Sequence, residues 1–185
     1  LPPALDSYGN KLSYDSVLNP FPLVNVKQTP VQIEVERLTD AIQKTPISTP
    51  SRNYNGIELN KEDYHDWMLL SRKKLLINDM TFTQTLRATM NSEVYRTSID
   101  EFKLTMLQGV KRAFDTAGNR ALMQHSPEYR DKWIMRKTAV SKAQMELQGE
   151  GTEDVVPEFI DALADIEFEI MNPDSKEVFY NKRRK

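Results

Sequence analysis

The prolines of this chain divide it into two parts. Seven of the ten lie within the first fifty residues, and each removes a backbone donor and restricts the residue before it. Long regular elements are therefore excluded from residues 1–28. After Asn60, by contrast, apolar residues recur at helical spacing. The pattern predicts a mainly α fold, with an extended proline-rich arm followed by a helical assembly of about six helices and no significant sheet.

The arm is richer in large apolar side chains than a free linker, which is normally poor in them. We therefore expect it to lie in a groove of a neighbouring molecule, and we expect the chain to be part of a longer protein that its neighbours hold in an assembly. The predicted partner interface comprises apolar residues of the arm and of the first helix after it: Leu12, Tyr14, Leu18, Phe21, Leu23, Tyr64 and Trp67.

Capping signals predict where the helices begin. Thr29-Pro30-Val31-Gln32 is a capping box with proline at the first helical position, so a short helix should span about 30–44. Asn60 can cap the next helix, and similar boxes begin at Thr81 and Ser98. The predicted divisions are an arm over 1–56, a helical body over 57–148, and a hinge, acidic helix and basic tail over 149–185.

The longest predicted helix runs from Ser98 to about Gln124. Its expected buried face comprises residues at helical spacing: Ile99, Phe102, Met106, Val110, Ala113, Ala117 and Ala121. Gly109 and Gly118 lie inside this helix, where each costs up to about 1 kcal/mol relative to alanine. We expect a close helix crossing at the three alanines to compensate for that cost.

Charge is balanced over the whole chain but not along it. The net charge is -2 and the pI is near 5.8, so nothing global favours nucleic acid or an anionic membrane. Residues 103–147 are mainly basic, whereas residues 150–177 carry ten acidic residues and one lysine. The two stretches are either solvated faces, an internal pair of complementary helices, or a docking surface for partner subunits.

Residue types that carry chemistry are sparse. The chain has no cysteine, which excludes disulfides and thiolate metal sites. His65 and His125 have no partner at metal-ligand spacing, and neither a nucleophile elbow nor a glycine-rich phosphate loop occurs. We therefore expect no catalytic residue, metal, cofactor or small-molecule substrate.

Two basic clusters are candidates for contact with nucleic acid. The run Lys182-Arg183-Arg184-Lys185 ends the chain, and Arg72-Lys73-Lys74 lies near the end of a predicted helix. Several phosphate contacts would give affinity that does not depend on base sequence and weakens with salt. Such clusters also act as solubilising tails. A nucleic-acid-binding helical packaging module is therefore the alternative function.

Several short motifs of the first half occur together in one known class of protein. They are Gly9-Asn10, the segment from Thr29 to Leu38 with its Arg37-Leu38 pair, and the helix start from Gly56 to Tyr64 with sequence GIELNKEDY. With this spacing the chain resembles the C-terminal region of large virion proteins of tailed bacteriophages, over about residues 6–125. This class includes internal virion or ejection proteins and tape-measure-like tail components.

The resemblance implies a structural role in a bacteriophage particle. The implied function is that of an internal ejection protein in genome delivery, acting through subunit assembly near the portal or tail. Its partners would be portal, tail or inner-core subunits and further copies of itself, with possible non-specific DNA contact. Its location would be inside the particle or its tail, after synthesis in the host cytoplasm.

Overall fold

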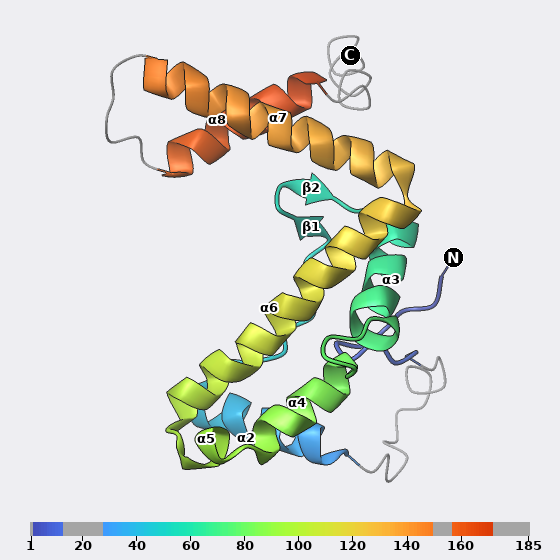
Figure 1. Cartoon of the computed structure of the whole chain (residues 1–185), viewed down its shortest axis with the longest axis vertical. Coiled ribbons are helices and arrows are strands. Elements are labelled where there is room, and N and C mark those ends of the chain that lie inside the picture. Colours follow the sequence, from blue (N-terminus) through green and yellow to red (C-terminus); the bar gives the residue numbers. More distant parts are fainter. Residues whose placement is uncertain (1, 13–27, 150–156, 172–185) are drawn as a thin grey trace, which may run out of the picture. The chain divides into compact units, whose positions relative to one another are not determined.

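The computed structural model describes residues 2–12, 28–149 and 157–171. Within these residues the fold is mainly helical, and the strands form a single two-stranded sheet, which confirms the predicted fold class (Figure 1). Seven α-helices and one π-helical segment occur in the described ranges. The elements are α2 (Pro30–Ile42), β1 (Asn53–Tyr54), β2 (Ile57–Glu58), α3 (Lys61–Leu69), η1 (Leu70–Lys74), α4 (Phe82–Asn91), α5 (Glu93–Thr97), α6 (Asp100–His125), α7 (Pro127–Gly149) and α8 (Pro157–Met171).

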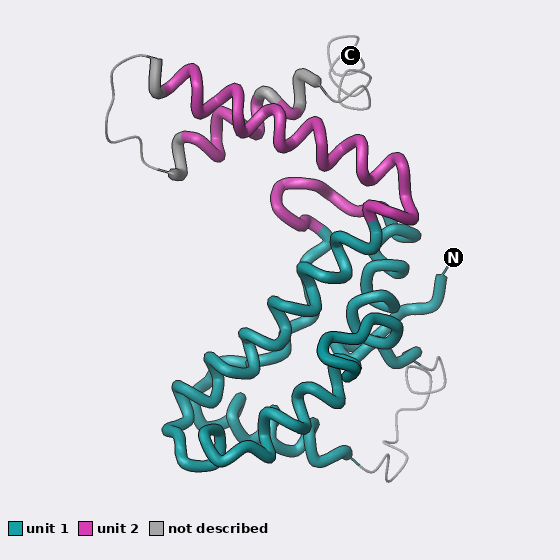
Figure 2. Tube along the Cα trace, in the orientation of Figure 1, with its two compact units in different colours: residues 1–52, 60–122 teal, residues 53–59, 123–185 magenta. Residues whose placement is uncertain are grey.

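The chain divides into two compact units (Figure 2). Unit 1 comprises residues 1–52 and 60–122, and unit 2 comprises residues 53–59 and 123–185. The boundaries differ from the predicted division into arm, body and tail. The difference arises because α2, expected in the arm, packs against α4, whereas β2 packs against α7. None of the described helices is both long and apolar enough to be a membrane span.

The predicted caps at Thr29, Asn60 and Thr81 are present, whereas the Ser98 hydroxyl of the predicted third box donates instead to the Val94 carbonyl. In α2 the Thr29 side chain accepts from the backbone of Gln32, and the Gln32 side chain accepts from the backbone of Thr29. Thr81 and Gln84 form the same reciprocal pair at the start of α4. Each pair satisfies two backbone donors that a helix leaves unpaired at its first turn.

Unit 1 is held together by a core of large apolar side chains. The buried members come from α2, the loop after it and α4 to α6: Val31, Val35, Leu38, Ile47, Phe82, Leu86, Tyr95, Leu107 and Phe114. The rings of Phe82 and Phe114 meet edge to face, with centroids 5.6 Å apart. Each such ring contributes roughly 1.5–3 kcal/mol when buried. This core is therefore the main source of the unit's stability.

The predicted buried face of α6 is correct in part: Met106 and Val110 pack partly buried against the core, but its first members are exposed. Ile99, just before the helix, is 71% exposed and Phe102 is 49% exposed. The apolar side chains that α6 buries are Leu104, Leu107, Phe114 and Leu122.

The close crossing of α6 is also at a different position. A Cβ added to Gly118 would lie 2.7 Å from the Cβ of Ser71 and 2.9 Å from Cδ1 of Trp67. The glycine itself, and not the expected alanines, permits the close approach. Gly109 has no neighbour within 4 Å of the same test atom.

Residues 2–12 form a small loop on the surface of unit 1. The Asp6 carboxylate accepts from the backbone N–H groups of Tyr8 and Asn10, and Gly9 adopts a φ of +79°. A side chain at Gly9 would clash with Arg72, whose Cβ would lie 2.7 Å from the added atom. Glycine is therefore required here by backbone conformation and by space.

Unit 2 combines a β-hairpin with a pair of helices. β1 and β2 pair antiparallel with Tyr54 opposite Ile57, and the intervening Asn55 and Gly56 both have positive φ, as a tight two-residue hairpin turn requires. α8 packs along α7 (Figure 1). The described buried positions of these two helices are Tyr129, Arg136, Ala139 and Ala143 in α7 and Ala164 and Phe168 in α8.

Candidate functional site

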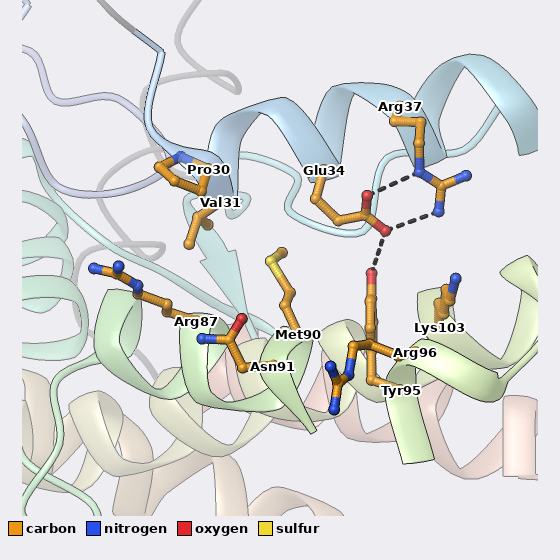
Figure 3. Close-up of a pocket in the computed structure, with 10 residues that line it drawn as sticks. All are labelled: Pro30, Val31, Glu34, Arg37, Arg87, Met90, Asn91, Tyr95, Arg96 and Lys103. Carbon is orange, nitrogen blue, oxygen red and sulfur yellow. Dashed lines mark hydrogen bonds and ion pairs between the residues drawn. The ribbon is translucent and has the colours of Figure 1, made fainter. Parts of the chain in front are cut away.

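An open pocket of about 540 Å³ lies within unit 1, between α2 and the helices α4, α5 and α6 (Figure 3). Helix α2 supplies one wall, the end of α4 and the short α5 supply the other, and the first turn of α6 closes one side. The lining residues are Pro30, Val31, Glu34, Arg37, Arg87, Met90, Asn91, Tyr95, Arg96 and Lys103. We refer to this site as the arginine pocket.

Glu34 is the centre of a hydrogen-bond network in the arginine pocket. Its Oε1 accepts from the Tyr95 hydroxyl at 2.8 Å and from Arg37 Nη2 at 2.8 Å, while Oε2 accepts from Arg37 Nε at 2.8 Å. The Arg37 hydrogen bond lowers the pKa of Glu34. Burial and the bond to Glu34 raise the pKa of Tyr95. Glu34 is therefore ionised and Tyr95 neutral at neutral pH.

Arg37 is shared between two carboxylates. Its Nη2 also lies 3.0 Å from Oδ1 of Asp100, and this hydrogen bond lowers the pKa of Asp100. Lys103 lies 3.9 Å from the same Asp100 oxygen and 5.4 Å from the centre of the Tyr95 ring. Glu34 and Asp100 thus balance Arg37 and Lys103, and these four groups sum to zero charge.

Arg87 and Arg96 are the remaining charges of the pocket. Both are exposed, and among the described residues neither has an ion-pair or hydrogen-bond partner. In Figure 3 the two side chains lie on opposite sides of Asn91. The pocket therefore presents an excess of two positive charges beside the apolar side chains of Pro30, Val31 and Met90. Such a surface can bind an anionic group that carries an apolar part.

A second charged cluster is buried and has a structural role. Arg72 is 1% exposed; its Nη2 lies 2.7 Å from Asp115 Oδ1 as an ion pair, although the angles are not those of a hydrogen bond. Its Nε donates to the Ser7 carbonyl at 2.9 Å, and its guanidinium lies 4.3 Å from the centre of the Phe82 ring. Arg72 therefore cannot contact nucleic acid, which corrects that part of the sequence hypothesis.

Within the described residues, the arm is held by its own chain. Arg72 bonds Ser7, Lys73 donates to Asn10 at 2.5 Å, and the Tyr8 ring lies 6.4 Å from that of Phe82. Burial raises the pKa of Tyr8 to about 12. A neighbouring molecule is therefore not needed to hold residues 2–12.

The predicted interface residues have different environments. Leu12 is 50% exposed, whereas Trp67 is 1% exposed and donates through Nε1 to the Asp115 carbonyl at 3.1 Å. Tyr64 is half-buried and donates to the Pro50 carbonyl at 2.8 Å. Trp67 is thus a core residue of unit 1. Tyr14, Leu18, Phe21 and Leu23, and the predicted nucleic-acid residues Lys182, Arg183, Arg184 and Lys185, lie outside the described residues.

An exposed apolar corner joins α5 to α6. Val94 is 62%, Ile99 71% and Phe102 49% exposed. We refer to these three residues as the apolar corner. Ile99 and Phe102 were predicted to be buried, and this prediction is wrong. The sequence contains no signal that separates an exposed apolar stripe from a buried one.

Candidate metal ligands are sparse among the described residues. No group of three or more histidine, aspartate or glutamate side chains that could hold a metal ion occurs among them. Comparison with known proteins adds no identification, because no protein-family model, curated protein or solved structure matches this chain. The resemblance to phage virion proteins stays a prediction from sequence.

Proposed function

We propose that this chain is a non-catalytic structural component of a bacteriophage particle, an internal ejection protein that acts in genome delivery by assembling with other subunits near the portal or tail. The sequence resemblance to phage virion proteins supports the assignment to a bacteriophage particle. The apolar corner is the observation that carries the assembly role, because three large apolar side chains close together in the chain are exposed and exposed apolar surface of this kind marks contact sites on proteins.

The short helix α5 and its junction with α6 leave the side chains of the apolar corner exposed. Helix α5 has only five residues, and its buried residue is Tyr95, so the preceding Val94 faces solvent. Ile99 lies between the end of α5 and the start of α6, where the backbone of Ile99 accepts from Phe102 and Lys103. A stable interface usually buries more than about 1,200 Å², so the corner would be the centre of a larger contact.

The residues on which the resemblance is based have structural roles in the fold. Gly9 allows the loop to approach Arg72, the segment from Thr29 to Leu38 forms a capped helix that enters the core, and Gly56 makes the hairpin turn with a φ of +82°. Within that segment Glu34 and Arg37 also line the arginine pocket. The roles of the glycines and of the buried residues of α2 support a structural function for the motif.

Sedimentation of the isolated chain tests the assembly role. We expect concentration-dependent oligomers that dissociate in Ile99→Asp, because the substitution places a charge in the contact. Met145→Asp is the matched control, since Met145 is 72% exposed on α7 of unit 2. A wild-type chain that sediments as a monomer at about 100 μM, well above the Kd of a stable complex, would contradict the proposal. Mass spectrometry of purified particles tests the virion location, where the chain should be present in many copies.

The alternative of a nucleic-acid-binding packaging module has less support. Arg72 is occupied inside unit 1, and Lys73 bonds Asn10. The alternative therefore depends on the exposed Lys74 and on residues 182–185. A gel shift at low salt tests it directly, because binding through phosphate contacts would retard DNA and weaken steeply with added salt.

A further inference from the structure

We propose that the arginine pocket binds an acidic peptide segment of a partner protein, in which an aliphatic side chain lies between carboxylates. The inference adds a second contact site to the proposed function, and it rests on that function only for the partner being another virion protein. The pocket itself is defined by α2, α4, α5 and α6 of unit 1 alone.

The charge of the partner follows from the ion pairs of the pocket. Arg37 is engaged by Glu34 and Asp100, and Lys103 compensates the second carboxylate. Arg87 and Arg96 have no carboxylate partner among the described residues. A guanidinium offers a planar fork of donors that matches a carboxylate. The two unpaired arginines therefore favour a ligand with two anionic groups.

The apolar wall indicates what must lie between those groups. Val31 is 2% exposed, Met90 is partly buried against the core, and both line the pocket with Pro30. The accessible part of this wall is the exposed Pro30 with the partly buried Met90. An aliphatic side chain can rest on these two while carboxylates on either side reach Arg87 and Arg96, which flank Asn91 (Figure 3). The Asn91 amide can bond a peptide backbone. A volume of about 540 Å³ is within the range of ligand sites.

A peptide fits this pocket better than a nucleic-acid strand. The ionised Glu34 lines the same pocket and would face any continuous row of phosphates. Bases also need exposed aromatic faces on which to stack, but the pocket's only ring, that of Tyr95, is 3% exposed. A peptide can place its carboxylates at the two arginines and leave the position facing Glu34 uncharged.

Fluorescence anisotropy of the full chain with a labelled peptide of sequence EELVEE tests the proposal. We expect saturable binding that weakens as salt is raised, because the arginines are exposed. The double variant Arg87→Ala with Arg96→Ala should bind the peptide about tenfold more weakly than the wild type. A tenfold change corresponds to the free energy of about one charge-assisted hydrogen bond. Arg112→Ala is the control, since Arg112 is an exposed arginine of α6 outside the pocket. It should bind as the wild type does.

Two further peptides separate charge from the apolar anchor. The peptides KKLVKK and EEGSEE should both bind much more weakly than EELVEE. The proposal is overturned if EELVEE does not bind, if the double variant binds as tightly as Arg112→Ala, or if an oligothymidine displaces the peptide at equal concentration and loses affinity in the same double variant. The last result would assign the pocket to nucleic acid.

The peptide-binding proposal and the assembly proposal can fail independently of each other. Ile99→Asp should abolish oligomers without changing peptide affinity, because Ile99 does not line the pocket. Loss of peptide binding in Ile99→Asp, or oligomers that dissociate only in the arginine double variant, would show that the pocket is occupied by a second copy of the chain and would overturn the proposed partner.

Discussion

Unit 1 and unit 2 each bury an arginine side chain, but only unit 1 also buries the partner. Arg72 is 1% exposed and its partner Asp115 is 7% exposed. Arg136 in unit 2 is 8% exposed, whereas the side chain of its partner Asp165 is 61% exposed. The exposed carboxylate of Asp165 keeps much of its solvation by water. Arg72 has instead exchanged water for contacts with Asp115, Ser7 and the Phe82 ring, so its stability in the interior depends on these groups.

The surroundings of the two arginines differ in the same way. Arg72 lies against large apolar side chains, in a core built from several elements. Arg136 lies against the backbone of the hairpin turn, where a Cβ on Gly56 would be 2.7 Å from its Nε. Half of the described buried positions of α7 and α8 are alanines, and the others are Tyr129, Arg136 and Phe168. Unit 1 therefore buries both groups of its ion pair among large side chains, whereas unit 2 buries one group beside small residues.

The largest predicted effect comes from removing one partner of the buried pair. Asp115→Ala should lower the free energy of unfolding of unit 1 by about 3–5 kcal/mol, because Arg72 is left buried without a counter-charge. Asp165→Ala should cost less than about 1 kcal/mol, since exposed pairs contribute little. Urea unfolding followed by the fluorescence of Trp67, in a Trp133→Phe background, measures the first effect.

A double substitution sharpens this prediction. Replacing both partners, with Arg72→Met and Asp115→Leu, should restore most of the lost stability, because apolar pairs of similar volume often equal a buried ion pair. Equal losses for Asp115→Ala and Asp165→Ala would remove the distinction between the two units. Failure of the double variant to recover would indicate that the bonds to Ser7 and Lys111 dominate instead.

The second prediction uses the two glycines of α6, both in unit 1. Gly118→Ala should destabilise by about 1–3 kcal/mol, because the added methyl meets Ser71 and Trp67 in a packed interior. Gly109→Ala should stabilise by up to about 1 kcal/mol, because its site is open and alanine is the better helix former. Thermal unfolding of the two variants should therefore shift in opposite directions. Shifts of the same sign would contradict the close crossing.

The smallest predicted effect is a pH dependence confined to unit 1. Hydrogen bonds from Arg37 lower the pKa values of Glu34 and Asp100 in the folded state. The stability that they contribute is present above the unfolded pKa values, and it is lost as pH falls through the folded ones. The protection factors of the α2 and α5 amides against hydrogen exchange should therefore fall between about pH 5 and pH 3.

Glu34→Gln provides the control for the pH prediction. The variant should flatten the dependence, and it should cost about 1 kcal/mol or less at pH 7, since Arg37 is 45% exposed and solvent screens the pair. An unchanged acid response in Glu34→Gln would show that other carboxylates cause it. A larger loss of protection in α7 and α8 than in α2 over the same pH range would place the acid-sensitive groups in unit 2.

The local features of the fold were predictable from the sequence because they depend on neighbouring residues. A threonine and a glutamine three positions apart satisfy the same backbone donors in any protein, and Asn55-Gly56 favours a tight turn wherever it occurs. The helix starts at Thr29, Asn60 and Thr81 were predicted on this basis and are present. The arginine pocket was not predicted, because Arg87 and Arg96 resemble any other exposed helical charge until α2 packs opposite them.

Sequence alone determined the mainly helical character, the helix starts at Thr29, Asn60 and Thr81, and the scarcity of reactive groups, since all of these follow from local chemistry and composition. Tertiary structure decided which apolar stripe of α6 is buried. Residues on both stripes recur at helical spacing, and Gly118 against Trp67 and Ser71 selects between them. The same packing removed Arg72 from the surface and left Ile99 on it. Burial depends on what lies opposite a residue, and that contact partner is distant in the chain.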